Sequence, residues 1–216
     1  MTANPNPVLV GIIAGLVTAI LMAAAGYASL FAIVLTIAAM ISVFIAGLGF
    51  GIASCLIAIA VAAGSTALLY SNPMSFVAMT LLLLPVAVMS YLANLARPAT
   101  EIGGPNTAMA WYPLSDILLA GAVVTAVGTI VTLMIQPDLG AVYATLADMI
   151  IAMMREIDPP MPVDADTRVK IIGFFELLFP LMQSLQLMMA LFAGFYFAMR
   201  ILTASGRSLR PREDIR

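Results

Sequence analysis

Three polar side chains interrupt the last apolar stretch of the sequence: Glu176, Gln183 and Gln186. On an α-helix, seven residues bring Glu176 and Gln183 to nearly the same face, and Gln186 is offset by about 80°. An ionisable side chain at membrane depth is costly, so it marks a functional candidate. We predict that these side chains help to bind a small solute. The alternative is that Glu176 lies at the membrane interface, solvated, with Arg168 and Lys170 nearby.

A second polar pattern lies in an earlier apolar stretch, where small and hydroxylated residues follow one helical face. Its members are Gly121, Thr125, Gly128, Thr129 and Thr132. Hydroxyl groups on such a face bond to another helix, bond to their own preceding turn, or line a polar cavity. We assign Thr125 and Thr129 to the predicted solute site, and internal hydrogen bonding is the alternative.

A stripe of small residues follows the first apolar stretch at intervals of four: Gly11, Gly15, Ala19 and Ala23. This spacing lets two helix backbones approach closely, and lipid itself gives helices no hydrophobic reason to associate. We predict a docking face for a partner membrane protein. The alternative is helix packing inside this chain.

The sequence shows no catalytic constellation. The chain has no His, which is the usual general base and the commonest metal ligand. Its single cysteine, Cys55, lies in an apolar run and suits a packing role. Asp116, Asp138 and Asp148 lie at expected helix ends or interfaces, so the paired aspartates of an intramembrane protease are missing. We therefore expect no enzymatic activity, no metal site and no cofactor.

The amino-acid composition is typical of a membrane protein. Hydrophobic residues make up 63% of the 216 residues and charged residues 9%, against about 45–50% and 25% in soluble domains. Residues 1–96 contain no Asp, Glu, Lys, Arg or His. The lipid bilayer is thus the expected surrounding. The apolar runs are continuous, which excludes an outer-membrane barrel, and nothing in the net charge of −2 suggests nucleic acid.

The expected fold class is all-α, a polytopic membrane protein with about six transmembrane helices, because one span needs about 20 apolar residues. The predicted spans cover residues 8–24, 30–48, 52–69, 74–95, 113–135 and 180–203. They form one integral membrane domain over 1–204, and a basic cytoplasmic tail follows over 205–216.

Three local features refine these spans. The first apolar run lacks the basic flank of a signal peptide, so we expect it to be retained. The glycines of 47–51 predict a tight turn between two helices. The last helical run, 168–203, would be about 54 Å long, so we expect Pro180 to divide it and to begin the sixth span.

One segment, 139–157, differs from the spans. Its apolar residues recur at intervals of three and four: Leu139, Val142, Tyr143, Leu146, Ile150, Met153 and Ile157. Asp148, Arg155 and Glu156 lie off that stripe. The pattern predicts an amphipathic helix that lies on the membrane surface.

The distribution of basic residues predicts the orientation. With six spans, both termini share one side, which collects Arg97, Arg200, Arg207, Arg210, Arg212 and Arg216. The segment 138–170 on the other side has three basic and six acidic residues. We therefore expect cytoplasmic termini and an external amphipathic helix.

Three short motifs resemble a known family. They are Leu95-Ala96-Arg97-Pro98, Trp111-Tyr112-Pro113-Leu114, and Ser205-Gly206-Arg207 followed by Arg210-Pro211 and an acidic residue. On these motifs the chain resembles the uncharacterised YybS-like bacterial membrane proteins, the DUF2232 group, over most of its length. Members of that family continue into further apolar spans, so the resemblance implies a short or truncated member in a bacterial inner membrane.

The YybS-like family is similar at fold level to the S components of energy-coupling-factor transporters. Those six-helix proteins dock on a transport module through small residues, spaced by four, on their first helix. The resemblance thus implies a transport-related function: binding of a small, largely apolar solute between spans and docking on a partner membrane protein. The alternative is a non-transporting membrane scaffold, or an assembly partner for envelope machinery.

Overall fold

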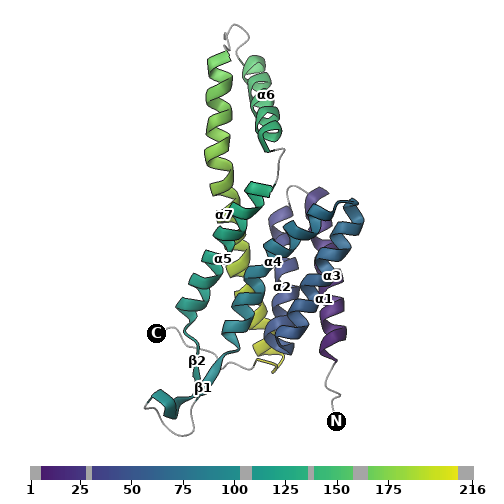
Figure 1. Ribbon diagram of the computed structural model, residues 1–216, viewed down its shortest axis with the longest axis vertical. Coiled ribbons are helices and arrows are strands. Elements are labelled where there is room, and N and C mark those ends of the chain that lie inside the picture. Colours follow the sequence, from purple (N-terminus) through teal and green to yellow (C-terminus); the bar gives the residue numbers. More distant parts are fainter. Residues whose placement is uncertain (1–5, 28–30, 103–108, 136–138, 158–164, 209–216) are drawn as a thin grey trace. The chain divides into compact units, whose positions relative to one another are not determined.

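The computed structural model describes residues 6–27, 31–102, 109–135, 139–157 and 165–208. Within these ranges the chain is almost entirely helical, with one short hairpin (Figure 1). The elements are α1 (Pro7–Tyr27), α2 (Ala32–Phe50), α3 (Ile52–Tyr70), α4 (Pro73–Ala93), β1 (Ala96–Pro98), the 3-10 turn η1 (Ala99–Ile102), β2 (Met109–Trp111), α5 (Leu114–Ile135), α6 (Leu139–Ile157) and α7 (Ala165–Ala204).

Six helices in the described part of the chain, α1 to α5 and α7, are long and apolar enough to cross a membrane. Each predicted span falls on one of them, and the first five agree to within three residues at either end. Long apolar runs form helices in lipid because a helix satisfies its backbone hydrogen bonds within one segment. The all-α class with about six transmembrane helices is therefore confirmed.

Pro180 does not divide the last helix, contrary to our prediction. α7 runs without a break through Pro180, and its 40 residues correspond to about 60 Å. Proline lacks an amide hydrogen and crowds the preceding turn. Its neighbours here are good helix formers, and an apolar surrounding offers the backbone few other hydrogen-bond partners. The predicted sixth span, 180–203, is thus the C-terminal part of a longer helix.

Residue contacts divide the chain into two compact units. Unit 1 comprises Met1–Gly128 and Leu187–Arg216, and unit 2 comprises Thr129–Gln186. Helices α5 and α7 contribute residues to both units. The single membrane domain over 1–204 stays a prediction, and residues 209–216 of the basic tail lie outside the described residues.

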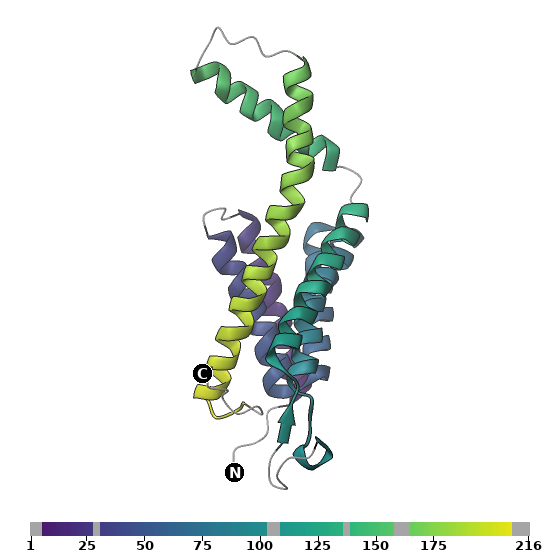
Figure 2. The same cartoon turned by 90° about the vertical axis from the view of Figure 1, so that its left-hand side faces the viewer.

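In unit 1, helices α1 to α4 lie side by side (Figure 1 and Figure 2). Side chains in the C-terminal part of α7 pack against α2. The rings of Phe44 and Phe195 meet edge to face with centroids 5.5 Å apart. Gly194, the residue before Phe195, faces Met40, and an added Cβ at Gly194 would lie 3.1 Å from the Met40 Cβ. The fully buried side chains of this core include Met40, Val43, Phe44, Leu83, Val86, Met89 and Leu191.

Two hydroxyl groups join α1 to α2 inside unit 1. The Thr18 hydroxyl of α1 lies 2.7 Å from the Ser42 hydroxyl of α2, and it also donates to the Ala39 carbonyl of α2 at 3.3 Å. Such bonds satisfy polar groups that lipid cannot solvate, and each contributes about 1 kcal/mol to helix association.

The tight turn predicted over 47–51 is present between α2 and α3. Gly51 has a φ of +93°, a backbone conformation that favours glycine, and its amide donates to the Gly47 carbonyl at 3.1 Å. The Asn94 side chain donates to the same carbonyl at 3.0 Å, which ties the end of α4 to this turn.

The connector after α4 contains a hairpin that we did not predict. β1 and β2 pair antiparallel with Arg97 opposite Ala110, and the Tyr112 amide donates to the Leu95 carbonyl at 3.2 Å. Strands of three residues are too short to show an alternation of polar and apolar side chains, so no periodic signal marks them in the sequence.

α6 covers the predicted residues, but its apolar stripe is divided between two environments. The buried side carries Tyr143, Ala147 and Ile151, whereas Val142, Met149, Ile150 and Met153 are exposed. Within unit 2, Tyr143 meets the ring of Phe179 on α7 with centroids 5.8 Å apart. α6 is thus the helix expected from the sequence, and Tyr143 of its apolar stripe is buried inside the protein. The location of α6 on the membrane surface stays a prediction.

Candidate functional site

The small-residue stripe of α1 is used for helix packing inside the chain. An added Cβ at Gly11 would lie 2.7 Å from the Ser54 carbonyl oxygen, and one at Gly15 would lie 2.6 Å from that of Ala58. Both carbonyls belong to α3, so the glycines let two backbones approach closely. Ala19 is only 3% exposed, and Ala23 is half-buried. This arrangement corresponds to the alternative that we left open, and partner docking through the stripe stays a prediction.

The hydroxyl face of α5 is buried, and its bonds are internal at Thr125. The Thr125 hydroxyl donates to the Gly121 carbonyl of its own preceding turn at 2.8 Å. Thr129 is also buried. Around the same face, Gly121 approaches Met89 and Leu191, which leaves no room for a larger side chain. Internal hydrogen bonding, the alternative to a polar cavity, is confirmed for Thr125.

The remaining predicted solute-binding residues are exposed. Glu176, Gln183 and Gln186 all lie on the part of α7 that belongs to unit 2, whereas Thr125 belongs to unit 1. A role of these five residues in solute binding stays a prediction. Among the described residues, no three His, Cys, Asp or Glu side chains gather into a possible metal site.

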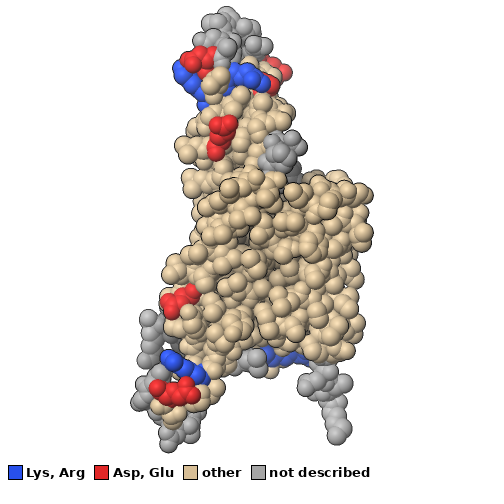
Figure 3. Space-filling view, viewed as in Figure 1, with Lys and Arg blue, Asp and Glu red and all other residues tan. Residues whose placement is uncertain are grey.

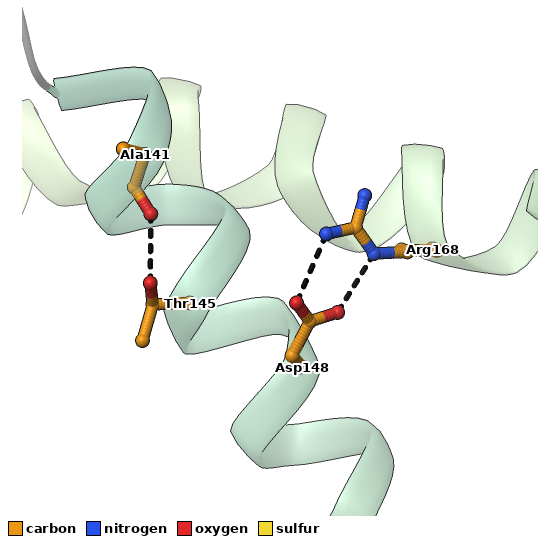
Figure 4. A network of polar contacts seen from close by, with 4 residues as sticks. All are labelled: Ala141, Thr145, Asp148 and Arg168. Carbon is orange, nitrogen blue, oxygen red and sulfur yellow. Dashed lines mark hydrogen bonds and ion pairs between the residues drawn. The ribbon is translucent and has the colours of Figure 1, made fainter.

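Unit 2 contains a polar contact that sequence analysis missed. Arg168 of α7 donates from Nε to Asp148 Oδ1 at 2.7 Å and from Nη2 to Oδ2 at 3.0 Å (Figure 4). A paired geometry of this kind is the strongest form of an arginine–carboxylate contact. Together with the Tyr143–Phe179 ring contact, it holds α6 against α7 at two points. The chemical signal was present in the sequence as opposite charges 20 residues apart, but nothing there specified the pairing.

The Asp148 contact makes helix pairing depend on pH. Hydrogen bonds from Arg168 lower the pKa of Asp148 below its usual value of 3.8. The carboxylate therefore stabilises the helix pair above that value, and this stabilisation is lost as the pH falls through the lowered pKa. Spin labels on exposed positions of α6 and α7, at Met149 and Val169 in a Cys55→Ala background, should show a distance distribution that broadens as the pH falls below the usual carboxyl pKa of 3.8.

Two variants separate this effect from general acid unfolding. Asp148→Asn should broaden the same distribution at neutral pH and should remove most of its pH dependence. Asp166→Asn breaks the Asp166–Lys170 ion pair within α7 and should leave the distribution unchanged. Equal acid broadening in the wild type and in Asp148→Asn would contradict the assignment.

A row of exposed apolar side chains follows the unit 2 part of α7. It consists of Phe174 (58% exposed), Leu177 (79%), Leu181 (65%) and Leu185 (52%). Intervals of three and four place them on one face of the helix, and Glu176 and Gln183 lie on the opposite side. We call these four residues the α7 apolar row. A row of this spacing is typical of a helix that packs against another helix.

Comparisons with protein-family models, curated proteins and solved structures found no match. The class of the protein therefore rests on its own helices: it is a multi-pass integral membrane protein. The YybS-like resemblance stays a prediction.

Proposed function

We propose that this integral membrane protein is a membrane scaffold or assembly partner. In this proposal unit 1 is the anchor, and the helix pair of unit 2 presents the α7 apolar row to another membrane protein. The proposal includes a bacterial inner membrane as the location and cytoplasmic termini as the orientation.

Two features of unit 2 support the proposal together: the exposed α7 apolar row and the charged residues in the same unit. Asp148, Asp166, Arg168, Lys170 and Glu176 are all found in unit 2. Ionisable side chains are costly at membrane depth, which argues that water or lipid headgroups reach this segment. Large exposed apolar side chains in such a setting are typical of a protein interaction surface. A partner helix laid along the row would bury them.

The transport-related hypothesis has less support from the geometry. The Thr125 hydroxyl is used within its own helix, and the small-residue stripe is used against α3. The glutamate and glutamines assigned to the solute are exposed on α7. The prediction remains open, and a solute that stabilises the purified protein would favour it, because a ligand of the native state raises its stability by mass action.

Photo-cross-linking in the native membrane tests the scaffold proposal. A photoreactive amino acid at Leu177 should give a discrete adduct with a second protein. The matched control is Ile20 of α1, which is 66% exposed on a helix with no ionisable residue. Position 20 should give lipid adducts only. Lipid adducts alone at both positions would contradict the proposal.

A further inference from the structure

The described charged residues of unit 1 lie at one of its ends. Its described ionisable residues are Arg97, Glu101, Asp116, Arg200 and Arg207. They lie near the hairpin, at the start of α5 and at the end of α7, where α2 ends and α3 begins (Figure 1). In the space-filling view, the visible face of the α1–α4 bundle is uncharged along most of its length (Figure 3). If unit 1 spans the bilayer, this charged end is one of the two ends that meet a headgroup layer.

The end of α7 fixes the position of Arg207. Gly206 has a φ of +68°, and its amide donates to the Thr203 carbonyl at 3.1 Å. The Arg207 amide donates to the Leu202 carbonyl at 2.9 Å. These two bonds and the left-handed glycine define a Schellman motif, which turns the chain back at a helix end.

This turn brings Arg207 over the end of α2. Leu202 is buried and approaches Gly49 so closely that an added glycine Cβ would lie 2.6 Å from its Cδ2. The Arg207 guanidinium carbon lies 5.2 Å from the centroid of the Phe50 ring. A guanidinium held over an aromatic face keeps its hydrogen-bond donors free for a ligand while its orientation is restricted.

Arg200, seven residues earlier, also lies over an aromatic ring, here one of α7 itself. Its guanidinium carbon lies 5.7 Å from the centroid of the Tyr196 ring, and both side chains are exposed. Phe197 and Ile201 beside them are exposed and apolar. Among the residues that the structure describes, neither Arg200 nor Arg207 forms an ion pair with a carboxylate.

We propose that Arg200 and Arg207 bind the phosphate groups of anionic phospholipids. Guanidinium groups bind phosphate with paired hydrogen bonds, and anionic lipid headgroups attract basic residues at a membrane surface. The exposed rings of Tyr196 and Phe197 supply the apolar surface that acyl chains need. The occupant is thus a phospholipid of net negative charge at the charged end of unit 1, and this inference is independent of the scaffold proposal.

The test uses the full chain purified in neutral detergent micelles. Adding phosphatidylglycerol should raise the thermal midpoint by several degrees, and phosphatidylcholine should raise it less, because only a ligand that prefers the native state stabilises it. Arg200→Gln with Arg207→Gln should lose at least half of the difference between the two lipids. Lys170→Gln, which removes an exposed charge in unit 2, should keep the full difference.

A second variant tests the proposal without replacing either arginine, in case the double variant fails to fold. Phe50→Leu keeps both arginines and removes the ring under Arg207, so it should reduce the lipid difference while the protein stays folded. Equal stabilisation by the two lipids, or an unchanged difference in the double variant, would overturn the proposal. An equal shift with inorganic phosphate alone would also overturn it, since the ligand would then be the free anion.

Discussion

Gly15→Ala is expected to destabilise the protein by about 1–3 kcal/mol, the usual cost of overpacking. The added Cβ would lie 2.6 Å from the Ala58 carbonyl oxygen and 2.7 Å from the Val61 Cβ. Backbone and Cβ atoms cannot move aside without separating α1 from α3. Thermal unfolding in detergent micelles, followed by circular dichroism, should show a clear fall in the midpoint.

Gly64→Ala provides the matched control on α3. Gly64 also lies inside a helix, but nothing is within 4 Å of its added Cβ. Alanine there should be neutral or should stabilise by about 0.5–1 kcal/mol, because it lowers the entropy cost of helix formation. If the Gly15 variant were as stable as the Gly64 variant, close packing of α1 on α3 would be wrong.

Gly47→Ala is expected to have a comparable effect at the charged end of unit 1. Its added Cβ would lie 2.6 Å from Ser90 Oγ, 2.7 Å from Ser90 Cβ and 3.2 Å from Cys55 Cβ. The Gly47 backbone is held by the Asn94 side chain and by the Gly51 amide, so it cannot shift freely. We expect a loss of about 1–3 kcal/mol of unfolding free energy.

A double-mutant cycle assigns this loss to the Ser90 contact. Ser90→Gly removes both nearest atoms, so Gly47→Ala should be much less destabilising in the Ser90→Gly background than in the wild type. The resulting interaction energy should be about 0.5–3 kcal/mol, the range for residues in direct contact. Additive losses would show that the cost of the Gly47 substitution arises elsewhere.

The helices could be predicted from the sequence because lipid imposes a simple requirement. A span needs a continuous apolar run of fixed length, and the run itself marks the helix ends. The amphipathic segment was also located correctly, since its apolar residues recur at intervals of three and four and its charged residues lie off that stripe. Pro180 was misjudged because its effect depends on what surrounds the helix.

The neighbours of each helix could not be predicted in the same way. The spacing of Gly11 and Gly15 indicates a close approach but does not say whether α3 or another protein supplies the second backbone. The apolar stripe of α6 likewise does not say which part faces α7. Hydrophobic periodicity specifies a face, and the contact that covers it depends on the rest of the fold.

The contacts at the candidate sites could not be predicted from the sequence either. Asp148 and Arg168 are separated by 20 residues, and a proline-rich segment lies between them. Exposed charges of opposite sign have many possible partners in a sequence, and only the pairing of α6 with α7 selects this one. The position of Arg207 over Phe50 depends in turn on the left-handed conformation of Gly206.

The scaffold proposal is tested most directly by photo-cross-linking at successive positions of α7 in the native membrane. The account predicts protein adducts at Phe174, Leu177, Leu181 and Leu185, at intervals of three and four. It predicts few or none at Glu176 and Gln183 on the opposite face. Adducts of equal yield at all positions, or adducts with lipid alone, would contradict a partner docked along the α7 apolar row.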